Sequence, residues 1–128
     1  KDDRNMLIDK MNNSDGIIFS SPNYSFNVSG LMKVFLDRLG FIFHRPRFFG
    51  KACTSIVVQG FYRGNKIIDY FNFIGKALGF NVVKGCCINS LEPMTEKEKK
   101  KIDRIIEKAR ANLRAIATHR CDPKGEGI

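Results

Sequence analysis

The fold is decided by residues 14–38, which read SDGIIFSSPNYSFNVSGLMKVFLDR. Within this stretch, the apolar run Ile17-Ile18-Phe19 stops at Ser20-Ser21-Pro22. A short run that is apolar on both faces is typical of a parallel strand that helices cover on both sides. We therefore predict a buried strand over residues 17–19, followed by a polar loop.

The residues after this loop predict a helix over residues 29–39. Ser29 is a favoured N-cap residue, because its hydroxyl can accept from an amide of the first turn. Apolar residues then recur at helical spacing, and they are Leu31, Val34, Phe35 and Leu39. Gly40 is expected to end the helix.

Helical and strand-like patterns alternate along the rest of the chain. The first half of the chain is predicted to contain a helix over 2–12, the strand over 17–19, the helix over 29–39 and an irregular segment over 41–50. The second half is predicted to contain a strand over 52–58, a helix capped by Gly64 or Asn65 and ended by Gly79, and a strand over 81–88. A last helix is predicted to begin at the capping box Thr95-Glu96-Lys97-Glu98. This order predicts an α/β fold, in which right-handed crossovers place helices on both faces of a three-stranded parallel sheet.

The composition limits the classes of function. The 128 residues, 43% of them hydrophobic, suffice for one domain. The net charge is +9, but the densest basic run, 97–101, is interleaved with glutamate, so we expect a solvated helix face and no nucleic-acid partner. No apolar stretch approaches the roughly 20 residues of a membrane span, and the charged N-terminus does not resemble a signal peptide. We therefore expect a cytoplasmic protein with no membrane partner.

The four cysteines do not have the spacing of a metal or redox site. Cys53, Cys86 and Cys87 lie in strand-like runs, and Cys121 lies in the polar C-terminal segment. No pair shows Cys-x-x-Cys spacing, so we expect three buried thiols, one exposed thiol and no metal.

Function is expected in the loops that follow the first two strands, because open α/β sheets bind ligands beyond the carboxyl ends of their strands. The loop over 20–30 combines Pro22 with aromatic rings and small polar donors, and it leads into a helix N-terminus. The loop over 59–64 has two glycines, an aromatic pair and Arg63. Such loops suit a flat heteroaromatic ligand, although composition alone fits ordinary turns equally well.

Residues 14–38 resemble the third strand, flavin loop and third helix of the NADPH-dependent FMN reductase-like family, which is related to iron–sulfur flavoproteins and NAD(P)H:quinone reductases. The resemblance is carried by Asp15-Gly16-Ile17-Ile18, Ser21-Pro22-x-Tyr24, Asn27-Val28-Ser29-Gly30 and Lys33-x-Phe35-Leu36-Asp37-Arg38. It implies a flavodoxin-like three-layer sandwich, of which residues 1–119 would supply strands 3-4-5 of a 2-1-3-4-5 order. Residues 120–128 would form a flexible tail.

The same resemblance implies a function. It implies non-covalently bound FMN, NAD(P)H as substrate, a small electron acceptor such as a quinone, and a homo-oligomer. The residues that it places around the flavin are Ser21, Pro22, Asn23, Tyr24, Phe26, Asn27 and Val28, together with Gly60, Phe61, Tyr62 and Arg63. No catalytic residue is assigned, because the reactive atom belongs to the cofactor.

The sequence also departs from the family. The family's first strand and the phosphate-binding loop after it have no counterpart in this sequence. The cysteine cluster of the iron–sulfur branch has no counterpart either, so no iron–sulfur site is expected. The strand over 17–19 should then be an exposed edge, one face of the following helix should lose its cover, and FMN should bind more weakly. Truncation of a longer protein is the favoured explanation; a missing half supplied by a partner and a paralogue that no longer binds flavin are the alternatives.

A non-catalytic interaction domain is the alternative function. It would use the exposed edge and the segment over 41–49, whose aromatic residues are Phe41, Phe43, Phe48 and Phe49. Several exposed aromatic side chains in one segment indicate an interface. His44, in the same segment, is expected at the surface or at that interface rather than in catalysis.

Overall fold

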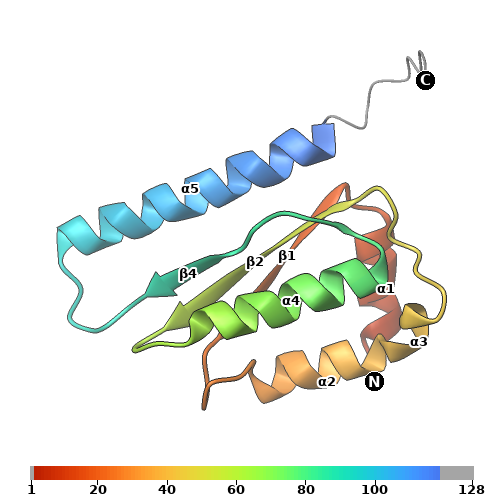
Figure 1. The fold of residues 1–128 in the computed structure, drawn as a ribbon, viewed down its shortest axis with the longest axis horizontal. Helices are drawn as coiled ribbons and strands as arrows, with labels where there is room; N and C mark the ends of the chain where they lie inside the picture. Colours follow the sequence, from red (N-terminus) through yellow and green to blue (C-terminus); the bar gives the residue numbers. More distant parts are fainter. Residues whose placement is uncertain (1, 119–128) are drawn as a thin grey trace.

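Strand β2 (Ala52–Gln59) is the central strand of a parallel sheet, and the other strands pair with it. The computed structural model describes residues 2–118. The remaining elements are α1 (Arg4–Asn12), β1 (Gly16–Pro22), α2 (Gly30–Arg38), α3 (Gly40–Phe43), α4 (Gly64–Leu78), β3 (Asn81–Val82), β4 (Cys86–Asn89) and α5 (Glu96–Thr118). The predicted α/β order and parallel sheet are confirmed (Figure 1).

The pairing of the strands fixes which residues share one end of the sheet. Strand β1 runs beside β2 from Gly16 opposite Ala52 to Pro22 opposite Val58. The third predicted strand, 81–88, is interrupted: β3 and β4 pair in turn with the other side of β2. Gly85 lies in the interruption, where a Cβ would come 2.7 Å from the Ser55 carbonyl oxygen, so a side chain there would push the two strands apart.

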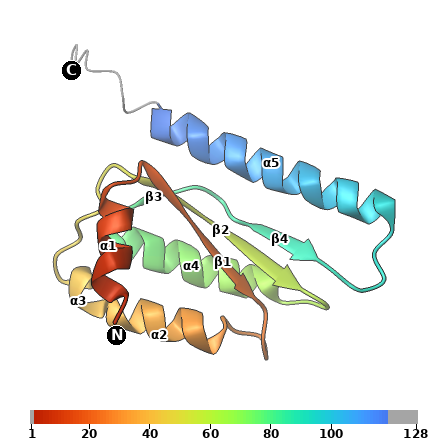
Figure 2. The same ribbon diagram turned by 180° about the vertical axis from the view of Figure 1, so that it is seen from behind.

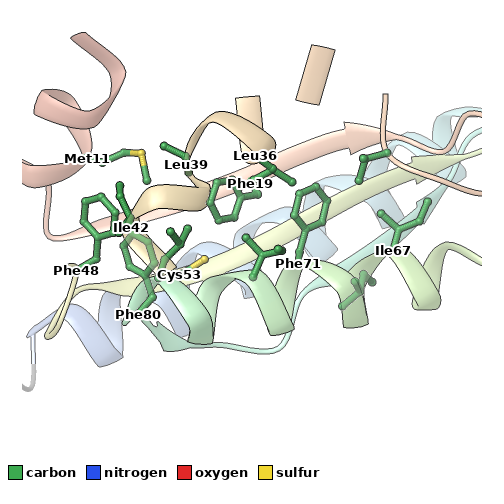
Figure 3. Packing of buried hydrophobic residues seen from close by; sticks show 14 of the residues in the cluster. Met11, Phe19, Leu36, Leu39, Ile42, Phe48, Cys53, Ile67, Phe71 and Phe80 are labelled. Atoms are coloured by element: carbon green, nitrogen blue, oxygen red, sulfur yellow. The ribbon is translucent and has the colours of Figure 1, made fainter. Parts of the chain in front are cut away.

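Helices cover the two faces of the sheet in separate layers. Figures 1 and 2 show α5 alone on one face and α2, α3 and α4 on the other. Between the sheet and this second layer lies the main core, in which Phe19 of β1 stacks on Phe71 of α4 with 5.5 Å between ring centroids (Figure 3). Helix α1 adds Ile8 and Met11 to the same core.

The helix ends follow local signals in most places. The Ser29 Oγ accepts from the Met32 amide at 3.3 Å, which confirms the predicted N-cap. Gly79, at φ 100°, ends α4 in the left-handed conformation that favours glycine. Helix α4 begins at Gly64 with Arg63 at the N-cap position, so neither predicted cap residue occupies that position.

Helix α2 ends at Arg38 with Leu39 as its C-cap, directly before Gly40, as predicted. Gly40 nevertheless begins another short helix, α3, which extends into the segment predicted to be irregular and corrects that part of the prediction. Leu39 and Ile42 are fully buried there. Burial of these two apolar side chains stabilises another helical turn, although a glycine interrupts the helical pattern. Phe48, predicted to be exposed, is also fully buried and stacks on Phe80 at 4.7 Å.

Helix α5 begins as the capping box predicts. The Thr95 amide donates to the Glu98 carboxylate at 2.7 Å, and the Glu98 amide donates to Thr95 Oγ1 at 3.3 Å. The bond from the Thr95 amide lowers the pKa of the Glu98 carboxyl group. Across residues 2–118, none of the helices is both long and apolar enough to span a bilayer.

Strand β1 leaves one side of the sheet unpaired, which confirms the exposed edge expected from the sequence. The Asp15 carbonyl and the Asn23 amide bond to β2. Because backbone groups alternate in direction along a strand, those of Gly16, Ile18 and Ser20 face away from β2. A groove of about 400 Å³ follows this edge; it is lined mainly by apolar side chains of α1, β1 and α2.

Helix α2 also leaves apolar side chains uncovered. Leu31 is 87% exposed and Val34 is exposed too, whereas Leu36 and Leu39 are buried. The predicted apolar stripe therefore faces the core only in part. The expectation that one face of this helix lacks cover is met.

We expect Phe71→Ala to lower the free energy of unfolding by about 3–5 kcal/mol, because it removes a buried aromatic ring from the main core. Phe71 is 1% exposed. Phe73→Ala is the matched control on the same helix: Phe73 is 70% exposed, and the change should stay within about 0.5 kcal/mol. Urea unfolding followed by circular dichroism measures both, and equal losses would contradict the packing described here.

We expect Ile18→Lys to reduce self-association, because a lysine on an edge strand opposes pairing with another strand. Sedimentation velocity over a range of protein concentrations measures the change. Leu31→Lys removes an even more exposed apolar side chain from α2, outside the sheet edge, and serves as the control. An effect of Leu31→Lys alone would assign self-association to the helix face instead of the edge.

Candidate ligand-binding site at the carboxyl ends of β1 and β2

The loops that follow β1 and β2 are joined by hydrogen bonds from Asn23. Its amide donates to the Val58 carbonyl at 2.8 Å, and its Nδ2 donates to the Tyr62 carbonyl at 3.1 Å. The two segments in which ligand binding was predicted therefore lie side by side, as parallel strands require.

The loop after β1 is a tight turn with unusual backbone angles. Tyr24 and Asn27 exchange two backbone hydrogen bonds of 3.0 Å. Between them, Ser25 and Phe26 have φ values of 50° and 64°. Residues with a Cβ rarely adopt this left-handed region, and such strain is concentrated at functional sites. The turn leaves the Phe26 ring exposed instead of packing it in the core.

The loop after β2 brings further aromatic rings and a positive charge to Phe26. The Tyr62 ring lies 5.6 Å from Phe26 and 5.4 Å from Phe61. The Arg63 guanidinium lies 5.8 Å from the Phe26 ring centroid and 5.9 Å from that of Tyr62, within the range of cation–π attraction. Arg63 reaches this position with a left-handed φ of 72°. These four side chains, the aromatic cluster, form an exposed cationic and aromatic surface.

A cavity of about 250 Å³ adjoins the aromatic cluster. Its lining residues come from the ends of three strands, and they are Asn23, Ser25, Phe26, Gln59, Gly60, Phe61, Tyr62 and Leu91. The volume is below the usual range of about 300–1,000 Å³ for small-molecule pockets. It suits one flat ring system better than a whole nucleotide. The larger groove at the β1 edge contains none of the predicted site residues.

The structure divides the predicted site residues into two groups. Those that line the cavity are Asn23, Phe26, Gly60, Phe61 and Tyr62. Arg63 lies over two of these rings, and Tyr24 is exposed on the same loop.

The other predicted residues hold the first loop in place instead of lining the cavity. Ser21 is buried, and its Oγ accepts from the Ser29 amide at 3.0 Å and donates to the Pro22 carbonyl at 2.9 Å. Asn27 Oδ1 accepts from the Val28 amide at 2.8 Å, and Val28 belongs to the core. Their role is to shape the turn that presents Phe26.

Sequence reasoning missed three lining residues: Ser25, Gln59 and Leu91. Ser25 and Gln59 lie in the two predicted ligand loops but were not singled out as site residues. Leu91 follows the third strand, so the rule that ligands bind beyond the carboxyl ends of strands pointed to its neighbourhood.

None of the described cysteines lines this cavity. Cys53 is buried, as predicted, and burial raises the pKa of its thiol to about 12. Cys86 and Cys87 are only half-buried, which corrects the prediction, and burial raises the pKa of each thiol. Cys121 lies outside the described residues. Within residues 2–118, no three histidine, cysteine or acidic side chains are grouped to hold a metal ion.

A parallel three-layer α/β fold with ligand loops at the carboxyl ends of its strands defines the flavodoxin-like class. Within that class, the chain belongs to the family of NADPH-dependent FMN reductases, whose model matches residues 1–90. The resemblance inferred from residues 14–38 is thereby confirmed.

Individual relatives support the same assignment. The chain is 33% identical to an iron–sulfur flavoprotein of Clostridioides difficile over 103 residues, covering 78% of this chain and 45% of that protein. It is 36% identical to an iron–sulfur flavoprotein of Archaeoglobus fulgidus over 95 residues, covering 66% and 43%. The chain therefore spans less than half the length of these curated relatives. The crystal structure of RosB with a bound riboflavin-phosphate intermediate has the same fold, with a TM-score of 0.78, 13% identity and coverage of 93% of this chain and 53% of RosB.

We expect Cys53 to resist alkylation by iodoacetamide at pH 8 in the native protein, because its raised pKa keeps the thiol protonated and only the thiolate reacts. Mass spectrometry of peptides from the labelled protein measures the modification at each site. Cys86 and Cys87 should react sooner than Cys53, and denaturant should remove the difference. Equal native rates at all three would contradict the burial of Cys53.

Proposed function

We propose that this chain forms the flavin-ring site of an FMN-dependent oxidoreductase, which takes electrons from NAD(P)H and passes them to a small acceptor such as a quinone. The observation that carries the proposal is the aromatic cluster beside the cavity at the ends of β1 and β2. Membership of the FMN reductase family agrees with it. The chain spans less than half the length of its curated relatives, so the activity of the whole protein is part of this proposal.

The donors and acceptors at the cavity fit a flavin ring. Asn23 Oδ1 is buried and has no hydrogen-bond partner among the described residues. Its Nδ2 already donates to two acceptors, Gln59 Oε1 and the Tyr62 carbonyl, so the amide cannot be turned over without losing both bonds. A buried acceptor requires a donor, and the imide N–H of an isoalloxazine is one. The exposed rings supply apolar faces for the remainder of the ring system.

The residues of this chain would bind and orient the ligand. When bound, FMN supplies hydride and electron transfer, chemistry that no protein side chain provides. Phe26 and Tyr62 would pack on the ring system and exclude water from it. Arg63 would add positive potential, which favours electron-rich ligands. Asn23 would fix the orientation of the ring by accepting a hydrogen bond. This division of roles needs no general acid or base from the described residues.

The proposal also includes the second substrate, the cellular location and the oligomeric state. A nicotinamide nucleotide would reach the exposed side of the aromatic cluster, and the protein would act in the cytoplasm as a homo-oligomer. Nucleic acid is not among the proposed partners, because basic and acidic side chains alternate at the start of α5 and form the pair Lys99–Glu96 at 2.9 Å.

A non-catalytic interaction domain is the second candidate. The free edge of β1, the groove beside it and the uncovered face of α2 favour it. Flavin binding separates the two candidates, since an interaction domain needs none.

We expect the protein to quench FMN fluorescence on titration, because flavin packed on aromatic rings loses its emission. Phe26→Ala and Tyr62→Ala should each weaken FMN binding roughly tenfold, the effect of about 1.4 kcal/mol. Phe49→Ala also removes an exposed ring, but from the segment before β2, and should leave binding unchanged. The flavin-loaded protein should then oxidise NADH or NADPH, followed at 340 nm. A folded protein that quenches no FMN would exclude the oxidoreductase and favour the interaction domain.

A further inference from the structure

Gln59, the last residue of β2, connects the ends of three strands beside the cavity. Its Oε1 accepts from Asn23 Nδ2 of the first loop at 3.2 Å and from the Gly64 amide at the start of α4 at 2.7 Å. Its Nε2 donates to Asn89 Oδ1 at the end of β4 at 2.8 Å. One side chain therefore holds the loop after β1, the start of α4 and the end of β4 in fixed relation.

The surroundings of Gln59 determine the orientation of its amide. The oxygen faces two N–H donors and the nitrogen faces an acceptor, so the reverse orientation would lose all three bonds. The Gln59 backbone is held as well, because its carbonyl accepts from the Ser90 amide at 2.9 Å. Hydrogen bonds at both ends of the residue leave the side chain little freedom to move.

Gly64 provides the space that the Gln59 side chain needs. A Cβ at position 64 would lie 2.6 Å from Gln59 Oε1 and would also collide with Cys87 Sγ. Gly64 is buried and begins α4. The contact therefore requires both a glutamine at the end of β2 and a glycine at the first position of the helix.

Gln59 would affect ligand binding through its hydrogen bond with Asn23. Its Nδ2 is shared between Gln59 Oε1 and the Tyr62 carbonyl, so Gln59 helps to keep the two loops at one distance from each other. It also leaves Oδ1, rather than Nδ2, as the unpaired atom of that amide. Both features would determine which ligands the cavity can bind.

We propose that Gln59 is a positioning residue of the ring site: it fixes the loops after β1 and β2 against each other and presents Asn23 as a hydrogen-bond acceptor for a flat ring that carries an N–H group. The proposal rests on the flavin function proposed above for its ligand, although the loop positioning can be measured without one. Gln59 also lines the cavity, but its proposed role is to hold Asn23 and the two loops in place.

The test uses lumiflavin, which has the ring system of FMN but no phosphate. We expect Gln59→Ala to weaken lumiflavin and FMN binding by the same factor, roughly tenfold, because it removes the three side-chain hydrogen bonds that order the loops. Gln59→Glu keeps the oxygen that accepts from Asn23 and Gly64 and loses only the donation to Asn89, so binding should stay within about threefold of the parent. Asn65→Ala, an exposed amide next to Gly64, is the matched control and should have no effect. Unchanged lumiflavin binding in folded Gln59→Ala would overturn the proposal.

A double-mutant cycle separates positioning from general stability. If Gln59 acts through Asn23, Asn23→Ala combined with Gln59→Ala should weaken lumiflavin binding no more than the more damaging single change. A residue that only stabilises the fold would lower the melting temperature and leave the affinity of the folded fraction unchanged. Additive losses of affinity would therefore contradict a shared route.

Hydrogen exchange measured by NMR without any flavin distinguishes failure of this proposal from failure of the proposed function. The Gly64 amide should lose its protection in Gln59→Ala and retain it in Gln59→Glu, because its acceptor is the Gln59 side chain. If the parent binds no flavin but Gly64 behaves in this way, the flavin function fails and the positioning of the loops stands. If Gly64 exchanges equally in parent and Gln59→Ala, the positioning fails whatever the protein binds.

Discussion

The burial of β2 on both faces is the constraint on which the rest of the structure depends. Its first four residues, Ala52–Ser55, are all buried. A strand in that position must satisfy its backbone groups on both sides by pairing, and β1 on one side with β3 and β4 on the other do so. Helices must then cover both faces. The three layers follow from one strand whose first four residues are buried on both faces.

The register of the strands that pair with β2 determines which residues meet at the candidate site. Pro22 lies opposite Val58 and Asn89 lies opposite Gln59, so the strands end at nearly the same level. Asn23 and Asn89 are thereby brought within reach of one glutamine side chain. The hydrogen bonds of Gln59 to Asn23 and Asn89 thus continue the connection between the strands one residue beyond their backbone pairing.

The loops beyond these hydrogen bonds depart from low-energy geometry. Phe26 and Arg63 have left-handed backbone conformations, and aromatic rings are in contact with solvent. Both features agree with the proposed binding of a flat ligand.

The free edge of β1 and the neighbouring face of α2 are not covered in the same way. Along β1, unpaired backbone groups lie above an apolar groove, and Leu31 of α2 is almost fully exposed. Such surfaces are ordinarily covered by further strands, helices or other chains. The site lies at the ends of the strands, so its loops keep their contacts with one another although this edge is free.

The sequence by itself determined most of the elements and the place of the candidate site, since these depend on local signals; it did not show the short helix α3 or the break between β3 and β4. Periodicity gave the helix and strand order, Ser29 and Thr95 marked helix starts, and the polar loops after two apolar strands located Asn23, Phe26 and the 60–62 segment. Only the tertiary structure decided which side chains are covered and which amides meet. Phe48 is buried because Phe80, distant in the sequence, stacks on it, and Leu31 is exposed because nothing in residues 2–118 packs over it. Gln59 could not be recognised for the same reason: its hydrogen-bond partners come from three separate segments, and their meeting depends on strand register, which no local pattern encodes.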